Sequence, residues 1–193
     1  MIYGTPIKGE DGMYHVKALT QENKKCFIKL SNVKVLDVDV STTGEVSFEI
    51  TGEENQSKID TINASILSSA LENSKEWFGK ELPEKIINNA FTKSEDISTD
   101  VIEATRIFDS EKQTIELSDD SNTVFCSGKV CSLFVEFAGI WFAKKAFGPS
   151  WNLVQVKIHE DKSEEPEKEE ESPVESYPEE YMFEDETEVE DSK

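Results

Sequence analysis

Hydrophobic and polar residues alternate along much of the first 50 residues, which is the pattern of half-buried β-strands. Residues 26–30 alternate, and residues 33–40 do so until the phase shifts at Leu36. A shift of this kind indicates a bulge or a bend in the strand. Residues 45–50 alternate without a break between two glycine-containing turns. The first quarter of the chain is therefore expected to be β structure.

The spacing changes to a helical period in the middle of the chain. Apolar residues recur there on one stripe, at Ile59, Ile62, Ile66 and Ala70. This stripe predicts a helix over about 58–76, with Ser57 as its N-cap. Pro83 suits the first turn of a second helix over 83–92. Residues 58–92 are therefore expected to form a helical insert.

Strand patterns return after the insert. Residues 101–108 and 151–158 are short and rich in β-prone residues, and residues 131–143 form the longest apolar stretch. Every second residue of that stretch is apolar or glycine, which fits a strand with one wholly buried face, and Gly139 marks a bend or a close approach within it. Several short strands around one helical insert predict a mainly β fold, an OB-like Greek-key barrel with a central helical insert.

The composition changes abruptly at about residue 160. The chain has 41 acidic and 20 basic residues and a formal net charge of −21, and residues 161–193 alone hold 16 acids and 3 lysines. That segment has almost no aliphatic side chains, so it cannot bury enough apolar surface to offset the entropy lost on ordering. We therefore expect a β-rich nucleic-acid-binding domain over 1–159, followed by a disordered acidic tail over 160–193.

Several classes of protein are disfavoured by the sequence. No run is long and apolar enough to cross a bilayer, and the first 30 residues show no secretory signal, so we expect an intracellular protein that is neither secreted nor membrane-bound. The three cysteines are interpreted as free thiols in a reducing compartment. The sequence shows neither a Gly-rich phosphate loop nor a local nucleophile–base pair, so we expect no enzyme, no metal and no cofactor.

Aromatic residues and lysines are grouped in two parts of the chain, at residues 77–80 and 142–151. Proteins that bind single strands use aromatic rings on which bases stack and lysines that follow the phosphates. A lysine-rich strip at residues 17–34 supplies further cations, which an acidic molecule needs because its overall charge repels nucleic acid. The candidate nucleic-acid-binding residues are Lys24, Lys25, Lys29, Trp77, Phe78, Lys80, Phe142, Lys144, Lys145, Phe147 and Trp151.

The same residues have a simpler interpretation, which the sequence leaves open. The aromatic residues could be core residues at strand ends, and this is the favoured interpretation for Trp141 because it continues the apolar face of its strand. The lysines could form an ordinary solvated face. Arg106 is the only arginine, which disfavours reading of base edges and favours loose contact with a nucleic-acid backbone.

The acidic tail also has two interpretations. A flexible polyanion can occupy the protein's own cationic groove and compete with nucleic acid, or it can recruit basic replication proteins. Tyr177, Tyr181, Met182 and Phe183 interrupt the acidic run, which is typical of a short recognition motif that orders on binding. Alternatively, the tail serves only to keep the protein in solution.

Two segments carry a resemblance to a known family. They are residues 75–80 (KEWFGK) and residues 131–158, in which the pattern GIWF…FG.SW..VQ is the specific part. They resemble proteins of large double-stranded DNA viruses of algae and protists, some of which look like OB-fold single-stranded DNA-binding proteins. The acidic C-terminus is similar in character to that of phage and bacterial single-strand binders. The resemblance implies a role in DNA replication and repair, with Trp141, Phe142, Trp151 and the nearby lysines in or beside the binding region.

The sequence therefore favours a non-enzymatic protein that binds single-stranded DNA without sequence specificity in viral DNA replication, recombination and repair. Its tail would tune DNA affinity and recruit replication proteins. The alternative is an acidic adaptor, chaperone or virion component that binds basic partner proteins. The oligomeric state stays open, with a dimer as one option.

Overall fold

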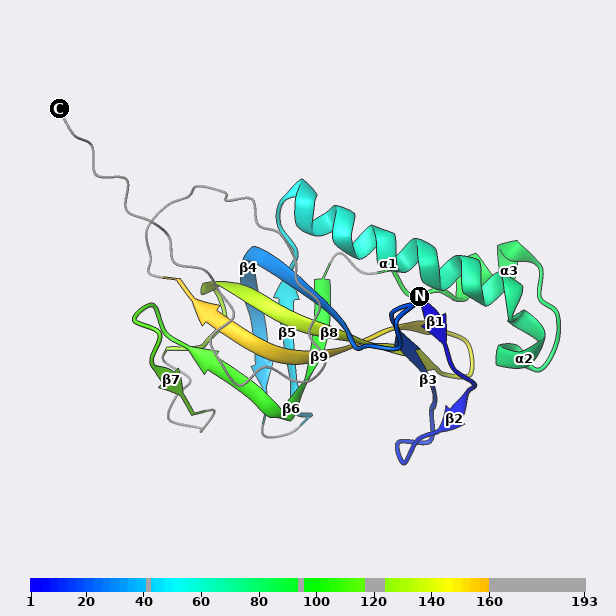
Figure 1. Ribbon diagram of the computed structural model, residues 1–193, viewed down its shortest axis with the longest axis horizontal. Helices are drawn as coiled ribbons and strands as arrows, with labels where there is room; N and C mark the ends of the chain where they lie inside the picture. Colours follow the sequence, from blue (N-terminus) through cyan, green and yellow to red (C-terminus); the bar gives the residue numbers. More distant parts are fainter. Residues whose placement is uncertain (41–42, 94–95, 117–123, 160–193) are drawn as a thin grey trace.

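The computed structural model describes residues 1–40, 43–93, 96–116 and 124–159. Within these residues the chain folds into a mainly β domain with a helical layer (Figure 1), which confirms the predicted fold class in outline. The predicted disordered tail, 160–193, lies outside the described residues.

Five strands pair with one another to close a barrel. Around the ring they are β4 (Cys26–Asp39), β5 (Glu45–Glu49), β6 (Asp96–Phe108), β9 (Phe147–Ile158) and β8 (Val130–Phe142), and β8 pairs again with β4. Neighbours in the ring are antiparallel except β6 and β9, which run parallel. A closed ring of five strands with a helical insert is consistent with the OB-like fold expected from the sequence.

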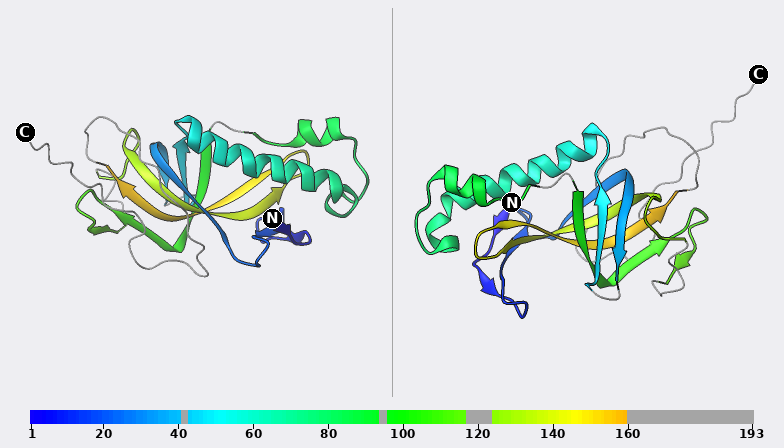
Figure 2. Two further views of the ribbon diagram at one scale, coloured as in Figure 1. Left: turned by 45° about the horizontal axis from the view of Figure 1, so that its top comes forward. Right: turned by 180° about the vertical axis from the view of Figure 1, so that it is seen from behind.

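Short strands extend the sheet beyond the ring. β3 (Tyr14–Leu19) pairs with β8, and β1 (Ile2–Tyr3) and β2 (Ile7–Lys8) pair with β3. β7 (Thr114–Ile115) pairs with the end of β6. Figure 2 shows that β1, β2 and β3 lie toward the same end of the molecule as α2 and α3, away from β7.

The long strand β4 joins two segments that the sequence pattern predicts separately. Its pairing shifts between Leu30 and Val33, and Asn32 in that stretch has a positive φ of 54°. A second shift lies between Val35 and Asp37, where the alternation in the sequence changes phase. The predicted bulge is confirmed, and the two irregularities let one strand pair with β8 along one part and with β5 along another.

The helical insert lies between β5 and β6 and consists of α1 (Glu53–Glu72), α2 (Ser74–Phe78) and α3 (Glu84–Ala90). The predicted helical insert is confirmed. It begins at Glu53 and ends at Ala90, compared with the predicted range of 58–92. None of the helices among the described residues has the length and apolar character that a membrane crossing requires.

The start of α1 is fixed by groups that the sequence pattern does not reveal. Gly52 precedes the helix with a φ of 82°, and two glutamates occupy the first turn, where they interact favourably with the helix dipole. The buried Asn55 side chain accepts a hydrogen bond from the Ser31 N–H at 3.1 Å and donates to the carbonyls of Ser31 and Thr51 at 2.6 and 2.7 Å. The predicted N-cap, Ser57, therefore lies inside the helix.

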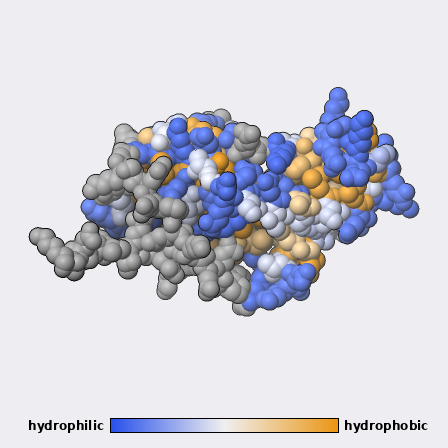
Figure 3. All heavy atoms as spheres, turned by 90° about the horizontal axis from the view of Figure 1, so that it is seen from above, coloured by the Kyte–Doolittle hydropathy of each residue, from blue (hydrophilic) through white to orange (hydrophobic). Residues whose placement is uncertain are grey.

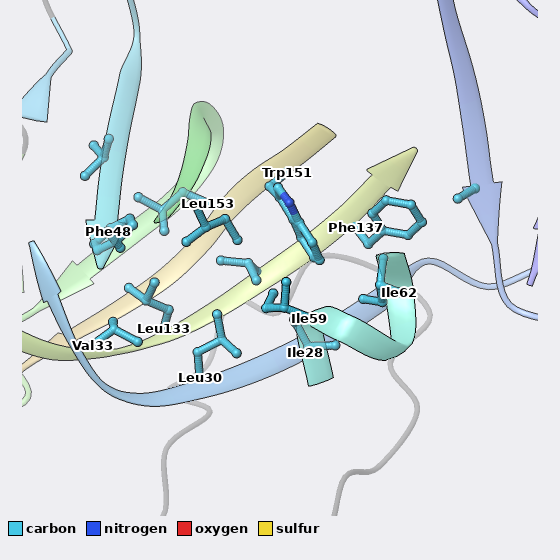
Figure 4. Close-up of a cluster of buried hydrophobic side chains, with 14 of the residues drawn as sticks. Ile28, Leu30, Val33, Phe48, Ile59, Ile62, Leu133, Phe137, Trp151 and Leu153 are labelled. Atoms are coloured by element: carbon cyan, nitrogen blue, oxygen red, sulfur yellow. The ribbon is translucent and has the colours of Figure 1, made fainter. Parts of the chain in front are cut away.

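The core lies between the barrel strands and the inner side of α1 (Figure 4). Trp151 on β9 packs against Phe137 on β8 with ring centroids 5.2 Å apart, and Figure 4 shows the helix beside both rings. Burial of such large apolar side chains is the main source of folding free energy. The predicted helical stripe is buried in this core, at Ile59, Ile62, Ile66 and Ala70.

Gly139 lies in β8 at a point where β3 passes close to it. Its φ is 149°, and a Cβ atom placed there would lie 1.9 Å from the carbonyl oxygen of Val16. No larger residue fits unless β3 moves away, so the close approach predicted from the sequence is confirmed.

The three cysteines carry free thiols. Cys26 and Cys126 are half-buried, whereas Cys131 lies in the core. Burial raises the pKa of the Cys131 thiol, so this group stays uncharged at neutral pH and behaves as a small hydrophobic side chain.

Candidate nucleic-acid interface

Four adjacent barrel strands turn alternate side chains away from the core, and these side chains form one surface. On β4, Ile28 and Leu30 are buried, whereas Phe27 and Lys29 occupy the alternate positions and are half-buried. On β8, Phe134 likewise lies between two buried residues. We call this side of the four strands the outer face, and it consists of Lys25, Phe27, Lys29, Arg106, Phe134, Glu136, Asn152, Gln155 and Lys157, of which Glu136 and Gln155 are themselves buried.

Strand pairing lines up four side chains of the outer face in one row. Lys29 on β4 lies opposite Phe134 on β8, which lies opposite Gln155 on β9, and Gln155 lies opposite Arg106 on β6. Residues directly opposite on neighbouring strands have Cβ atoms about 5 Å apart. The row therefore runs from Lys29 through the half-buried ring of Phe134 and the fully buried amide of Gln155 to Arg106.

The ring of Phe27 stacks on the ring of Phe134. Their centroids are 5.3 Å apart and their planes differ by 15°. Both rings are half-buried, and among the described residues they lie outside the hydrophobic core cluster. Together they form a flat apolar platform beside Lys29, which is the type of surface on which a base stacks.

The acidic group on the outer face is compensated by its neighbours. The Nζ of Lys25 lies 3.4 Å from Oε1 of Glu136, and the side-chain amide of Asn152 donates to Oε2 of the same carboxylate at 3.0 Å. Lys157 adds a further cation on β9. The charge of Glu136 is thus offset locally by Lys25 and Asn152.

A second surface lies where the turn between β8 and β9 meets α2, α3 and the turn between β2 and β3. A cavity of about 910 Å³ opens there, which we call the hollow. Lys8 and Tyr14 are part of its lining. Seven of the eleven residues predicted from the sequence also line it: Trp77, Phe78, Lys80, Phe142, Lys144, Lys145 and Phe147.

The buried rings of the hollow pack against one another and join α2 to the β8–β9 turn. Phe142 and Phe147 stack with centroids 5.6 Å apart and planes 8° apart, and Trp77 meets Phe142 edge-on at 5.7 Å. Trp77 is 8 %, Phe142 7 % and Phe147 1 % exposed. The sequence left open whether these rings form a stacking floor or belong to the core, and the three buried rings continue the apolar faces of their elements into the core. Direct contact of these residues with nucleic acid stays a prediction.

The other four predicted residues do not line the hollow. Trp151 is only 4 % exposed and packs inside the core, so it offers no open ring. Lys24 forms an ion pair with Glu22 at 3.5 Å, and Lys25 and Lys29 belong to the outer face. The structure thus divides the single predicted groove into two surfaces.

One carboxylate at the edge of the hollow is held within its own turn. The Met13 N–H donates to one oxygen of Asp11 at 2.9 Å, and Nε2 of His15 lies 2.9 Å from the other oxygen. The hydrogen bond from Met13, followed by that with His15, lowers the pKa of Asp11, so the group is charged at neutral pH. Across the described ranges, no cluster of three or more histidine, cysteine, aspartate or glutamate side chains could hold a metal ion.

The residues that complete both surfaces were not among those predicted from the sequence. Phe27 and Phe134 alternate with buried residues, so the period of two was a usable signal for placing them outside the core. Lys157 has the same signal because it lies between the buried Val156 and Ile158, whereas the place of Arg106 beside Gln155 follows from strand pairing alone. Lys8 on β2 lines the hollow, and its place there likewise follows from the pairing of β2 with β3.

A family model matches residues 31–185, which is most of the chain, and the protein therefore belongs to DUF5871, a family of unknown function. The matched region begins within β4, includes the other four strands of the barrel and extends to residue 185. A comparison with curated proteins gave no match.

Among solved structures, the chain is similar to the single-stranded DNA-binding protein from bacteriophage Enc34. The free phage protein aligns with a TM-score of 0.47 and 14 % identity, covering 84 % of this chain and 92 % of that chain. Its complex with single-stranded DNA aligns with a TM-score of 0.44 and 16 % identity, covering 82 % and 96 %. A C-terminal truncation aligns with a TM-score of 0.44 and 15 % identity, covering 82 % and 95 %.

Proposed function

We propose that this protein binds single-stranded DNA without sequence specificity, as a non-enzymatic component of viral DNA replication, recombination and repair. The observation that carries the proposal is the row from Lys29 through Phe134 to Arg106, with the ring of Phe27 stacked on Phe134. A flat ring platform between two cations matches the needs of a stacked base and its flanking phosphates.

The bound strand would cross the row of the outer face. One base would stack on the ring pair, and the neighbouring phosphates would lie near Lys29 and Arg106. Stacking tolerates any sequence because every base has a π-face, whereas the bases of a duplex are already stacked on one another. The attraction is local on a molecule of net charge −21, so salt should screen it readily.

The wider role in the proposal rests on the sequence. The viral and replicative setting is supported by the resemblance carried by residues 75–80 and 131–158. The protein would act inside the host cell and need no cofactor. Its acidic residues 160–193 would compete with DNA for the cations of the outer face and recruit replication proteins, because a polyanion and a phosphate backbone are attracted to the same side chains.

Titrating a fluorescein-labelled dT oligonucleotide with the full-length protein tests this proposal. We expect a saturable rise in fluorescence anisotropy. The logarithm of the association constant should fall with the logarithm of the salt concentration with a slope of about −2 to −3, because about four cations displace counterions from a single strand. A duplex of equal length is the control and should bind at least about tenfold more weakly.

Two results would count against the proposal. An unchanged anisotropy at low salt would overturn it. Equal affinity for single strand and duplex would show that the protein is attracted only to the charge of the phosphates. Binding to basic proteins together with indifference to the oligonucleotide would favour the alternative of an acidic adaptor or chaperone.

A further inference from the structure

We propose that the hollow binds residues 177–186 of the same chain, the part of the acidic C-terminal region that carries aromatic side chains. This inference is independent of DNA binding by the outer face, because the hollow and the outer face share no residue. It assigns to the hollow a ligand of defined chemistry, a peptide with apolar anchors flanked by carboxylates.

The walls of the hollow are apolar and partly uncovered. Ile86 and Tyr14 line it and are each 49 % exposed, and Leu82 and Ile87 lie beside them. Seen from above, hydrophobic surface emerges among hydrophilic residues at the end of the molecule that carries the helices (Figure 3). The volume of about 910 Å³ is in the range of sites that hold a ligand of several large groups. A concave apolar surface of this kind favours insertion of aromatic or thioether side chains.

The rim of the hollow carries four lysines against one carboxylate, that of Asp11. Lys8, Lys80, Lys144 and Lys145 line it, and all four are exposed. Within the described residues, none of these four ammonium groups forms an ion pair. On an acidic protein, such a group of uncompensated lysines around one cavity is an attractive site for carboxylates.

Residues 177–186 carry the matching groups. The segment holds five acids and four large apolar side chains, the latter at Tyr177, Tyr181, Met182 and Phe183. Apolar anchors next to acidic residues suit a cavity with apolar walls and a basic rim. The family match extends to residue 185, so the anchors belong to the region that defines the family.

The chain is long enough to reach the hollow from its own barrel. The nineteen residues from Ile158 to Tyr177 can span about 60 Å when extended. The hollow lies near Phe147, at the opposite end of a twelve-residue strand, which is about 40 Å long. A short flexible connection gives an effective concentration in the millimolar range, so a weak site is occupied within one molecule.

The shape of the hollow favours side-chain anchors over nucleic-acid bases. A base needs an open ring face, but Phe142 and Phe147 stack on each other and are nearly inaccessible. The exposed walls are contributed in part by aliphatic side chains such as Ile86. The outer face has the opposite character, with a flat ring pair and polar neighbours.

Hydrogen–deuterium exchange on the full-length protein tests the inference. The triple variant Tyr181→Ala, Met182→Ala, Phe183→Ala should speed amide exchange about fivefold in residues 80–90 and 143–147, because the hollow loses its ligand. Exchange in residues 26–30 and 132–136 of the outer face should not change. The matched control is Val174→Ala with Val189→Ala, which removes apolar groups outside the segment and should leave the hollow protected.

A second pair of variants tests the basic rim. Lys144→Glu with Lys145→Glu should reproduce the effect of the triple variant, and combining both sets should add little more. Lys75→Glu with Lys85→Glu is the control, since both lysines are exposed and lie outside the hollow. Tenfold dilution should leave the protection unchanged, and protection lost on dilution would contradict docking within one chain.

An oligonucleotide arm separates this inference from the proposed function. Adding a dT oligonucleotide should protect the outer face. Protection of the hollow by the oligonucleotide, without any effect of the triple variant, would make the hollow a nucleic-acid site and overturn the inference. Unchanged exchange in every variant would also overturn it, while leaving DNA binding by the outer face intact.

Discussion

Replacing Phe27 and Phe134 together by alanine is expected to weaken binding of a dT oligonucleotide about 10- to 100-fold. The two rings stack with centroids 5.3 Å apart and act as one platform, so the double variant removes the contact with a stacked base. Base–aromatic stacking contributes about 1–3 kcal/mol per base, and about 1.4 kcal/mol corresponds to a factor of ten. Fluorescence anisotropy at fixed salt measures the change.

The matched control is Tyr14→Ala. Tyr14 is an exposed aromatic residue on β3, and it lines the hollow rather than the outer face. Its removal should change the affinity less than about twofold. Circular dichroism of both variants verifies that they are folded. Equal losses of affinity in the control and in the folded double variant would refute the assignment of the site to the outer face.

Gly139→Ala is expected to destabilise the fold by at least about 3 kcal/mol, which lowers the melting temperature by about 6–12 °C for a domain of this size. The added Cβ would lie 1.9 Å from the Val16 carbonyl oxygen, so β3 must separate from β8. Because β3 also carries β1 and β2, this change should loosen the end of the molecule that holds the hollow. Thermal denaturation followed by circular dichroism measures the loss.

Gly128→Ala provides a matched control for the backbone conformation. Gly128 also has a positive φ, 92°, but nothing lies within 4 Å of a Cβ added there. This variant should therefore lose only the conformational cost, about 1 kcal/mol. A melting temperature of Gly139→Ala as high as that of the control would show that β3 and β8 are not held in contact at this position.

Local periodicity predicted the elements that bury one face. The helical stripe beginning at Ile59 and the phase shift in the strand around Leu36 both appear in the structure as expected, since each depends on neighbours close in sequence. The early start of α1 was not predictable in the same way. It depends on Asn55 meeting the backbone of Ser31 on a distant strand, and no spacing along the chain encodes that contact.

The candidate site was only partly predictable for a related reason. The strip that holds Lys25 and Lys29 lies on the outer face, but the rings were chosen by their closeness to lysines in sequence. Trp151 continues a buried face and is covered, whereas Phe134 falls on the opposite side of its strand. Alternation could have separated these two cases. Phe134 and Arg106 lie on opposite sides of Gln155 because β8 and β6 both pair with β9, and this arrangement depends on the closed barrel.

The hollow shows a different limit of sequence reasoning. Residues 77–80 and 142–147 are separated by more than sixty positions, and the helical insert brings them together around one cavity. Both segments mix aromatic rings with lysines, so the sequence suggested that they belong to one site. The structure does bring them together around one cavity. The rings turned out to hold the insert on the barrel, through contacts such as that of Trp77 with Phe142.

Photocrosslinking tests the central claim most directly, because it reports which residues lie against the bases. The full-length protein bound to a dT oligonucleotide is irradiated with ultraviolet light, digested and mapped by mass spectrometry. The outer-face account predicts crosslinks in peptides that contain Phe27 or Phe134. Crosslinks confined to residues 77–82 or 142–147, obtained under conditions where the oligonucleotide is bound, would contradict it.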